Sequence, residues 1–322
     1  MQSKHVGYIL LGFFFASSNI YGYSQPMAWP SSSQTTSNTT PKKSGNAKDA
    51  LEMTKQIGNN YLNSQLKQSL SKWLTRTDID YAMQQKNNPV ASIETIQPLY
   101  LNDWHTVFVQ GRLAYSHTST TGNLGLGYRY LTHDKRWLWG VNTFYDQNFQ
   151  YTHKRIGFGG ELFNTYLTFR ANYYNAFSGK RQITSSVTQQ ALDGYDGSIE
   201  TPVPFIPWIR FKAEGYHWDA INADNVNGSS AMFRIYPTRQ LEVDVGVADD
   251  NSQGHQAFLE FDFYLDRPEF IQYSATTSKA SFSSGMAPLD VEALRLQKVI
   301  RHNDIVVEES INSNGVVIAR GT

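Results

Sequence analysis

The sequence of 322 residues contains no cysteine, is low in charged residues and has no excess of either charge. The absence of cysteine excludes a disulfide scaffold and a Cys-based zinc site. Charged residues make up 17% of the chain, against roughly 25% in ordinary soluble domains. Lys plus Arg and Asp plus Glu each number 28, so the chain lacks the surplus of positive charge that a nucleic-acid-binding protein needs.

Hydrophobic runs long enough to span a membrane as a helix are also missing. The apolar run from Val6 to Ala16 follows Lys4 and His5 and precedes small and polar residues, with a cleavage point expected at Gly22. This layout predicts a secretory signal peptide over residues 1–22, because a spanning helix needs roughly 20 apolar residues. If the mature chain lies in a membrane, it must therefore cross it as a β-barrel.

Two segments precede the region of predicted strands. Residues 23–48 are dominated by Ser, Thr, Asn and Pro and predict a flexible spacer. Asp49 is a candidate N-cap, and apolar residues then recur at three- and four-residue steps, which predicts an amphipathic helix over residues 49–74. This helix either packs on a soluble partner or plugs or guides a pore.

From about Thr75 the hydrophobic period changes to two. In Thr106–Ser116, T-V-F-V-Q-G-R-L-A-Y-S, apolar residues such as Val107 and Leu113 alternate with Gln110 and Arg112. Ten-residue segments of this kind, separated by turn residues, are typical of a transmembrane barrel. Turns are expected at Asp134–Lys135, Ser178–Gly179 and Asp249–Asp250. With weaker strands near 75–85, 92–101 and 194–203, the pattern predicts about twelve strands over residues 75–268.

The polar face of these strands separates a barrel from a soluble sandwich. A sandwich exposes its polar face to water and favours Lys, Glu, Ser and Thr there. This chain instead carries Arg, Asp and Glu with interspersed Gly on that face, and it contains 19 Tyr, 18 Phe and 7 Trp. A narrow charged lumen and a lipid-facing outer surface account for both features.

The inward-facing charges form the candidate site. The proposed lumen charge network consists of Arg112, Arg129, Asp146, Arg155, Glu161, Arg170, Arg210, Glu214, Arg234, Glu242, Asp244, Glu260 and Asp262. Lys212, Asp196 and Glu200 lie on the same face, which leaves a small acidic surplus. We hypothesise that Arg295, Lys298 and Arg301 from the segment after the barrel lie in this acidic lumen and hold that segment in place. The alternative is that the lumen charges pair only among themselves.

Two stretches carry a resemblance to a known family. Trp139–Asn148, WGVNTFYDQN, is followed by Arg155–Glu161, RIGFGGE, and Val291–Glu308, VEALRLQKVIRHNDIVVE, follows the last predicted strand. In order and spacing these resemble the barrel strands and the L-R…V-x-R-x-N-x-I-x-x-E segment of the intimin/invasin family, the inverse autotransporters of type V secretion. The resemblance covers residues 49–309.

This resemblance implies a twelve-stranded, monomeric barrel in the outer membrane of a Gram-negative bacterium, with its N-terminus in the periplasm. It implies that a linker, residues 269–309, runs through the pore to a surface tail, residues 310–322, and that lipid, periplasmic chaperones and the barrel-assembly machinery are partners. Family members normally carry extracellular Ig-like adhesion domains there. The chain departs from the pattern in lacking a peptidoglycan-binding module and in ending at Thr322, so the passenger is missing. Either the chain is a minimal barrel with its own role or it has been truncated, and the host receptor stays unknown.

Catalysis and a simple pore are the competing functions. His117, His133 and His153 are expected near strand ends, but none sits in a catalytic or metal-binding motif, so we expect no enzyme activity, no cofactor and no metal. A passenger-less barrel acting as a small outer-membrane pore is the alternative to anchoring and translocation, and occupation of the lumen by the linker distinguishes the two.

Overall fold

The computed structural model describes residues 76–85, 87–117, 119–265, 288–311 and 315–320, all of which belong to one structural unit. The predicted signal peptide, spacer and amphipathic helix, residues 1–74, lie outside the described residues, as do linker residues 269–287. No helix in the described part of the chain is long and apolar enough to cross a membrane.

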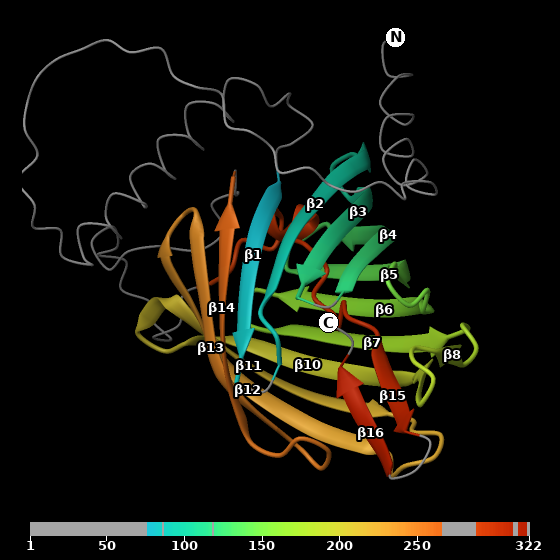
Figure 1. Ribbon diagram of the computed structural model, residues 1–322. Coiled ribbons are helices and arrows are strands. Elements are labelled where there is room, and N and C mark those ends of the chain that lie inside the picture. Colours follow the sequence, from blue (N-terminus) through green and yellow to red (C-terminus); the bar gives the residue numbers. More distant parts are fainter. Residues whose placement is uncertain (1–75, 86, 118, 266–287, 312–314, 321–322) are drawn as a thin grey trace, which may run out of the picture. The chain divides into compact units, whose positions relative to one another are not determined.

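Twelve antiparallel strands form a closed barrel (Figure 1). They are β1 (Thr77–Gln84), β2 (Val90–Leu101), β3 (His105–Ser116), β4 (Ser119–Leu131), β5 (Trp137–Asn148), β6 (Lys154–Asn164), β7 (Thr168–Ala176), β10 (Gly194–Val203), β11 (Ile206–Trp218), β12 (Val226–Thr238), β13 (Leu241–Asp250) and β14 (Gln256–Tyr264). The predicted all-β fold and its twelve strands are thus confirmed, including the three weaker strands, which are β1, β2 and β10.

The barrel closes where its first strand meets its last. β1 pairs with β2 on one side and with β14 on the other, and Figure 1 shows β1 beside β14. The register along this closing seam runs from Asp78 opposite Tyr264 to Gln84 opposite Phe258. Closure matters because a sheet edge exposed to lipid would leave unpaired backbone groups that nothing in the hydrocarbon can satisfy.

The two ends of the barrel differ in their connections. At one end, here called the short-turn end, strands are joined by turns of residues 102–104, 132–136, 165–167, 204–205 and 239–240. At the other, the loop end, connections include residues 177–193 and 219–225. The predicted turn at Asp134–Lys135 joins β4 to β5, with Lys135 at a φ of 55°. The other two predicted turns lie at the loop end, where Asp249 and Asp250 end β13 and the turn itself follows at 251–255.

Aromatic and aliphatic side chains cover the outer face. Near the loop end, exposed tyrosines lie on β1, β3, β5, β7 and β10: Tyr81, Tyr115, Tyr145, Tyr173 and Tyr195. Near the short-turn end, Tyr100, Tyr128, Trp137 and Trp139 are exposed, while Leu126, Val141 and Phe158 are exposed farther along their strands. Two aromatic girdles on either side of an apolar band are the expected outer surface of a barrel in lipid.

A second, smaller sheet was not predicted. The loop between β7 and β10 contains β8 (Arg181–Gln182) and β9 (Val187–Ala191), and β9 pairs with β15 (Val306–Ile311), which pairs with β16 (Gly315–Arg320). Because β9 and β15 pair across more than a hundred residues, as in Ala191 opposite Val307, the sheet ties the C-terminal segment to the loop end.

Glycines on the inner face of β4 make room for aromatic rings. A Cβ added at Gly127 would lie 2.1 Å from the Phe108 ring, and one added at Gly125 would lie 2.3 Å from the Phe144 ring. Both rings belong to a buried cluster with Ile96 and two linker residues. The small residues on β4 therefore let the barrel wall pack against the linker.

We predict that Gly127→Ala destabilises the barrel by about 1–3 kcal/mol, since the Phe108 ring must shift out of a packed cluster. The loss should appear as a lower temperature for conversion of the compact, folded band to the unfolded band in gel electrophoresis. Gly111→Ala is the matched control, because no atom lies within 4 Å of a Cβ added there. Equal behaviour of the two variants would show that the Phe108 packing contributes nothing.

Candidate functional site: the barrel lumen and the linker

Strand alternation brings the predicted charges together inside the barrel. All thirteen residues of the proposed lumen network have side chains on the inner strand faces, among them the fully buried Arg129, Asp146 and Arg155. Three further acidic side chains, Asp78 and Asp80 on β1 and Glu94 on β2, lie on the same surface and are buried. None of the three was among the predicted site residues, because the inner face of these two weaker strands was not assigned, although the alternation in T-D-I-D indicates it.

Most lumen arginines pair with carboxylates on nearby strands. Arg129 lies 2.7 Å from Glu161, and Arg155 lies 2.8 Å from Asp146. On the next strands, Glu200 accepts hydrogen bonds from Arg170 at 2.9 Å and from Arg210 at 2.5 Å. Removing one member of such a buried pair costs about 3–5 kcal/mol, because it leaves the other charge without a partner.

Apart from Arg112 on β3, which lies 3.6 Å from Asp304 of the linker, the remaining predicted charges lie on β11 to β14. Arg234 pairs with Asp244 at 2.6 Å and with Glu242 at 2.7 Å. Lys212 pairs with Glu214 at 2.5 Å, and Glu214 also lies 2.7 Å from His302 of the linker. Glu260 lines two adjoining cavities of about 260 and 190 Å³ between this wall and the linker.

The linker passes through the lumen from the short-turn end to the loop end. It enters through the short 3-10 helix η3 (Ala293–Leu296), whose Leu294 packs with Leu131, Leu138 and Phe163 beside the short turns. Farther along, Leu296 and Val299 pack against Phe108 and Phe144. The segment then reaches β15 and the second sheet at the loop end.

The three predicted linker cations do not share one kind of partner. Within the described part of the chain, Arg295 binds backbone oxygens and a hydroxyl rather than a carboxylate: its guanidinium donates to the backbone oxygens of Asn102, Asp103 and His105 and to the Thr106 hydroxyl. Arg295 therefore binds carbonyl groups near the β2–β3 turn, not the acidic side chains of the lumen as hypothesised.

Arg301 matches the hypothesis of a carboxylate partner. Its guanidinium donates two hydrogen bonds to Asp146, of 2.8 and 2.6 Å, and its Cζ lies 4.6 Å from the centre of the Phe144 ring. Gly157 leaves room for it, because a Cβ there would lie 2.9 Å from an Arg301 nitrogen. A bidentate pair stacked on an aromatic face is a strongly oriented contact.

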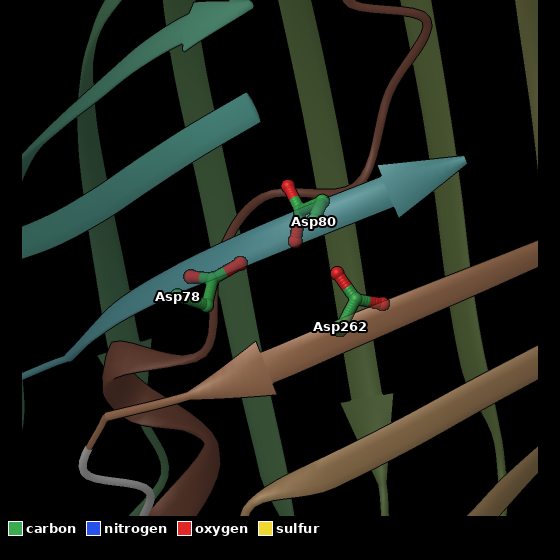
Figure 2. Close-up of side chains that lie close together, drawn as sticks. All are labelled: Asp78, Asp80 and Asp262. Carbon is green, nitrogen blue, oxygen red and sulfur yellow. The ribbon is translucent and has the colours of Figure 1, made fainter. Parts of the chain in front are cut away.

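Lys298 is surrounded by acidic residues of the closing seam. Its Nζ lies 2.7 Å from Asp78, 2.8 Å from Asp262 and 3.2 Å from Asp80. Figure 2 shows these three aspartates on the adjoining strands β1 and β14. One oxygen from each lies within 4.8 Å of the others, and Glu242, Asp244 and Asp262 form a second such group. Both groups resemble cation sites, but Lys298 supplies the cation for the first and Arg234 contacts two members of the second.

The barrel wall also binds the linker through its backbone. Arg129 donates to the carbonyl oxygens of Leu294, Arg295 and Gln297, and Arg155 donates to those of His302 and Asp304. Gln110 both donates to and accepts from the backbone of Val299. Asn123, Asn172 and Tyr174 make similar bonds to Asn303, Ile300 and His302. These uncharged residues were not predicted as linker contacts. Nothing in the sequence distinguishes a polar side chain that bonds to a distant backbone group from one that does not.

At the loop end the linker is held by Glu308. Its carboxylate accepts hydrogen bonds from the N–H groups of Ile221 and Asn222 and from the Asn222 side chain, at 2.6 to 3.2 Å. Burial raises the pKa of this carboxyl, but the donated hydrogen bonds outweigh burial and hold the pKa below its ordinary value of 4.5.

The three histidines considered for catalysis lie apart from one another. His133 stacks on Trp104 in the short-turn region, and His117 lies in the β3–β4 turn. His153 is buried at the loop end, with its Nδ1 3.5 Å from the Ser178 hydroxyl. This contact is long and Ser178 is buried, so Ser178 is not a nucleophile that a substrate could reach.

Comparison with known proteins identifies the family. The family model described as the inverse autotransporter beta-domain matches residues 29–303. The chain belongs to this family.

Relatives of this inverse autotransporter include invasin from Yersinia enterocolitica, 25% identical over 84% of the chain and 31% of the relative. Intimin from Escherichia coli O111:H- is 26% identical over 66% of the chain and 24% of the relative. The inverse autotransporter adhesin YeeJ from Escherichia coli K12 is 25% identical over 53% of the chain and 8% of the relative. The chain spans less than half the length of the curated relatives that it matches. The names of these relatives are those of adhesins and invasins.

A solved structure supports the fold of this inverse autotransporter. A membrane protein from a study of in-meso crystallisation superposes with a TM-score of 0.58 at 20% identity, over 73% of this chain and 99% of that chain. Fold and family together place the inverse autotransporter in the outer membrane, with its apolar face in lipid, as predicted.

We predict that Arg301→Glu raises single-channel conductance in planar bilayers, because the new carboxylate would face Asp146 and push the linker from its seat. Lys135→Glu is the matched control, since Lys135 pairs with linker residue Glu292 but both side chains are about half exposed, and exposed pairs contribute only about 0–1 kcal/mol. Conductance at the level of the unaltered protein in Arg301→Glu would show that this contact does not hold the linker.

A second prediction concerns Glu308. Its lowered pKa means that its contribution to β15 docking is complete above about pH 4.5 and is lost as the pH falls through the folded-state pKa. Glu308→Gln should speed amide hydrogen exchange in residues 306–311 at neutral pH, and the difference from the unaltered protein should shrink in acid. Glu309→Gln is the control, because Glu309 is bonded to the single side chain of Gln189. An equal effect of both variants at every pH would contradict this assignment.

Proposed function

We propose that this inverse autotransporter anchors its C-terminal segment in the outer membrane and carries that segment through the barrel to the cell surface. The observation that supports this most directly is the path of the linker, which runs along the lumen from η3 at the short-turn end to β15 at the loop end. A chain that crosses the barrel connects the two sides of the membrane that the barrel spans.

Connection lengths support one orientation. Outer-membrane barrels have short periplasmic turns and longer extracellular loops. By that rule the short-turn end faces the periplasm, and the loop end, where residues 177–193 and 219–225 meet the C-terminal strands, faces outward. The linker then enters from the periplasm and leaves at the surface.

The chemistry of the lumen suits an extended polypeptide. Gln110, Arg129 and Arg155 bind backbone groups of the linker, which any polypeptide offers, whereas Lys298 and Arg301 fix this particular segment through carboxylates. We infer that backbone contacts tolerate a passing chain and that the two cations end its movement when the linker reaches its seat.

The names of the relatives, which include an adhesin, suggest what is displayed. Adhesion or invasion through a C-terminal surface segment is therefore the proposed biological role, with the host receptor left open. Periplasmic chaperones and the barrel-assembly machinery are the expected partners during export. The small-pore alternative is not favoured, because the linker occupies the lumen and leaves cavities of about 260 and 190 Å³ beside it.

An epitope tag after Thr322 tests the proposal. We expect antibody labelling on intact cells and loss of the tag on treatment with external protease, because the segment after β15 is proposed to lie outside. A periplasmic marker must remain unlabelled to show that the outer membrane is sealed.

Two reference tags calibrate orientation. An epitope in the 251–255 loop should be labelled on intact cells, and one in the 132–136 turn should be labelled only after permeabilisation. If the folded barrel shows the expected pattern for both references while the C-terminal tag needs permeabilisation, translocation does not occur and the proposal is refuted.

A further inference from the structure

The strands around the closing seam carry carboxylates and no basic residues. β13, β14, β1 and β2 are consecutive neighbours in the barrel, and their sequences contain nine Asp or Glu and neither Lys nor Arg. Elsewhere in the lumen acidic residues are paired with arginines on nearby strands, as in Arg129 with Glu161. The seam therefore depends on cations that come from outside its own four strands.

The register places like charges opposite one another at this seam. Asp80 on β1 lies directly opposite Asp262 on β14, and Asp78 on β1 lies directly opposite Glu94 on β2. Figure 2 shows Asp78, Asp80 and Asp262 close together. Like charges facing each other across a pair of strands destabilise that pairing, and the effect is stronger where water is scarce.

The linker supplies the missing cation. Lys298 Nζ contacts Asp78, Asp80 and Asp262 and lies 3.8 Å from Glu94. Within the described residues, every ion pair of those three aspartates is made with Lys298. Of the cations on neighbouring strands, Arg112 lies opposite Glu94 and binds Ser92 and Asp304, whereas Arg234 binds Glu242 and Asp244.

The seam joins the first and the last strand of the barrel, which are far apart in the sequence. Its partners, such as Ile79 and Phe263, are far apart in sequence, whereas the other barrel pairings join strands connected by one turn or loop. A pairing of this kind gains nothing from local chain connectivity and must bear a large loss of chain entropy. Repulsion between carboxylates therefore acts at the pairing that is hardest to form.

We propose that Lys298 makes closure of the barrel depend on occupation of its lumen. β1 and β14 complete their pairing when the linker brings the Lys298 ammonium between Asp78, Asp80 and Asp262. Before that, the carboxylates hold the two strands apart. An empty, closed barrel is thereby disfavoured, so that assembly does not pass through an open channel in the outer membrane.

This inference rests on the linker lying in the lumen and not on which end of the barrel faces outward. It can therefore fail while the proposed translocation stands, and it can hold if the C-terminal tag stays in the periplasm.

The experiment measures closure of the seam in outer membranes. Because the chain has no cysteine, the pair Tyr81→Cys with Phe261→Cys, opposite each other on the outer face of β1 and β14, reports on the seam by disulfide formation. Lys298→Met should lower the disulfide yield at the seam by roughly tenfold or more, since it leaves buried carboxylates without their cation. Lys298→Arg should retain most of the yield, because the charge is kept.

Matched controls separate this effect from general misfolding. Thr143→Cys with Phe158→Cys spans β5 and β6 and should form its disulfide equally well in either background. Lys135→Met removes a cation that pairs with linker residue Glu292 at an exposed position away from the seam, and should leave the seam yield high.

Charge removal at the seam provides the decisive comparison. Asp262→Asn combined with Lys298→Met should restore the seam disulfide, because the directly opposed charges are gone even though the linker cation is still missing. The proposal is overturned if Lys298→Met alone cross-links the seam as fully as the parent. It is equally overturned if Lys298→Met lowers the yield but Asp262→Asn brings no recovery, since Lys298 would then act through packing and not through charge.

Discussion

Closure of the sheet between β1 and β14 is the constraint on which the rest of this structure depends. Lipid offers no hydrogen-bond partner to a sheet edge, so a membrane sheet must close on itself. Closure of twelve strands creates a lumen that the wall residues alone do not fill, with charged side chains directed inward by strand alternation. Those charges need partners, and the wall and the linker supply them jointly.

Local sequence pattern was sufficient to predict much of this architecture. The period-two alternation predicted twelve strands and the inner face of the thirteen network residues, because inward charge and outward apolar surface are both imposed by the membrane. The same pattern did not predict strand pairings between residues that are far apart in the sequence. β15, with the sequence V-V-E-E-S-I, has no alternation of its own and pairs with the short β9 far along the chain. The carbonyl partners of Arg295 could not be foreseen either, since every residue offers a carbonyl oxygen.

The linker is held by two kinds of contact that serve different purposes. Hydrogen bonds from Arg129 and Arg155 to linker carbonyls do not depend on linker side chains, and they suit a lumen through which a chain is proposed to pass. Contacts of Arg301 with Asp146 and of Lys298 with the seam carboxylates depend on particular residues and fix one register. The proposed passage of the chain would thereby have a defined end point, as the proposed anchoring of a surface segment requires.

We expect the linker to occupy the lumen of the barrel in the native outer membrane. The most direct test introduces Gln110→Cys together with Val299→Cys, at a wall residue whose side chain contacts the backbone of that linker residue, and treats outer-membrane vesicles with a short bifunctional thiol reagent. An intramolecular cross-link should form in nearly all folded molecules. None should form when Gln110→Cys is paired with Thr238→Cys, because Thr238 lies at the short-turn end. A folded barrel without the Gln110–Val299 cross-link would contradict the account, because the lumen would then be empty of its linker.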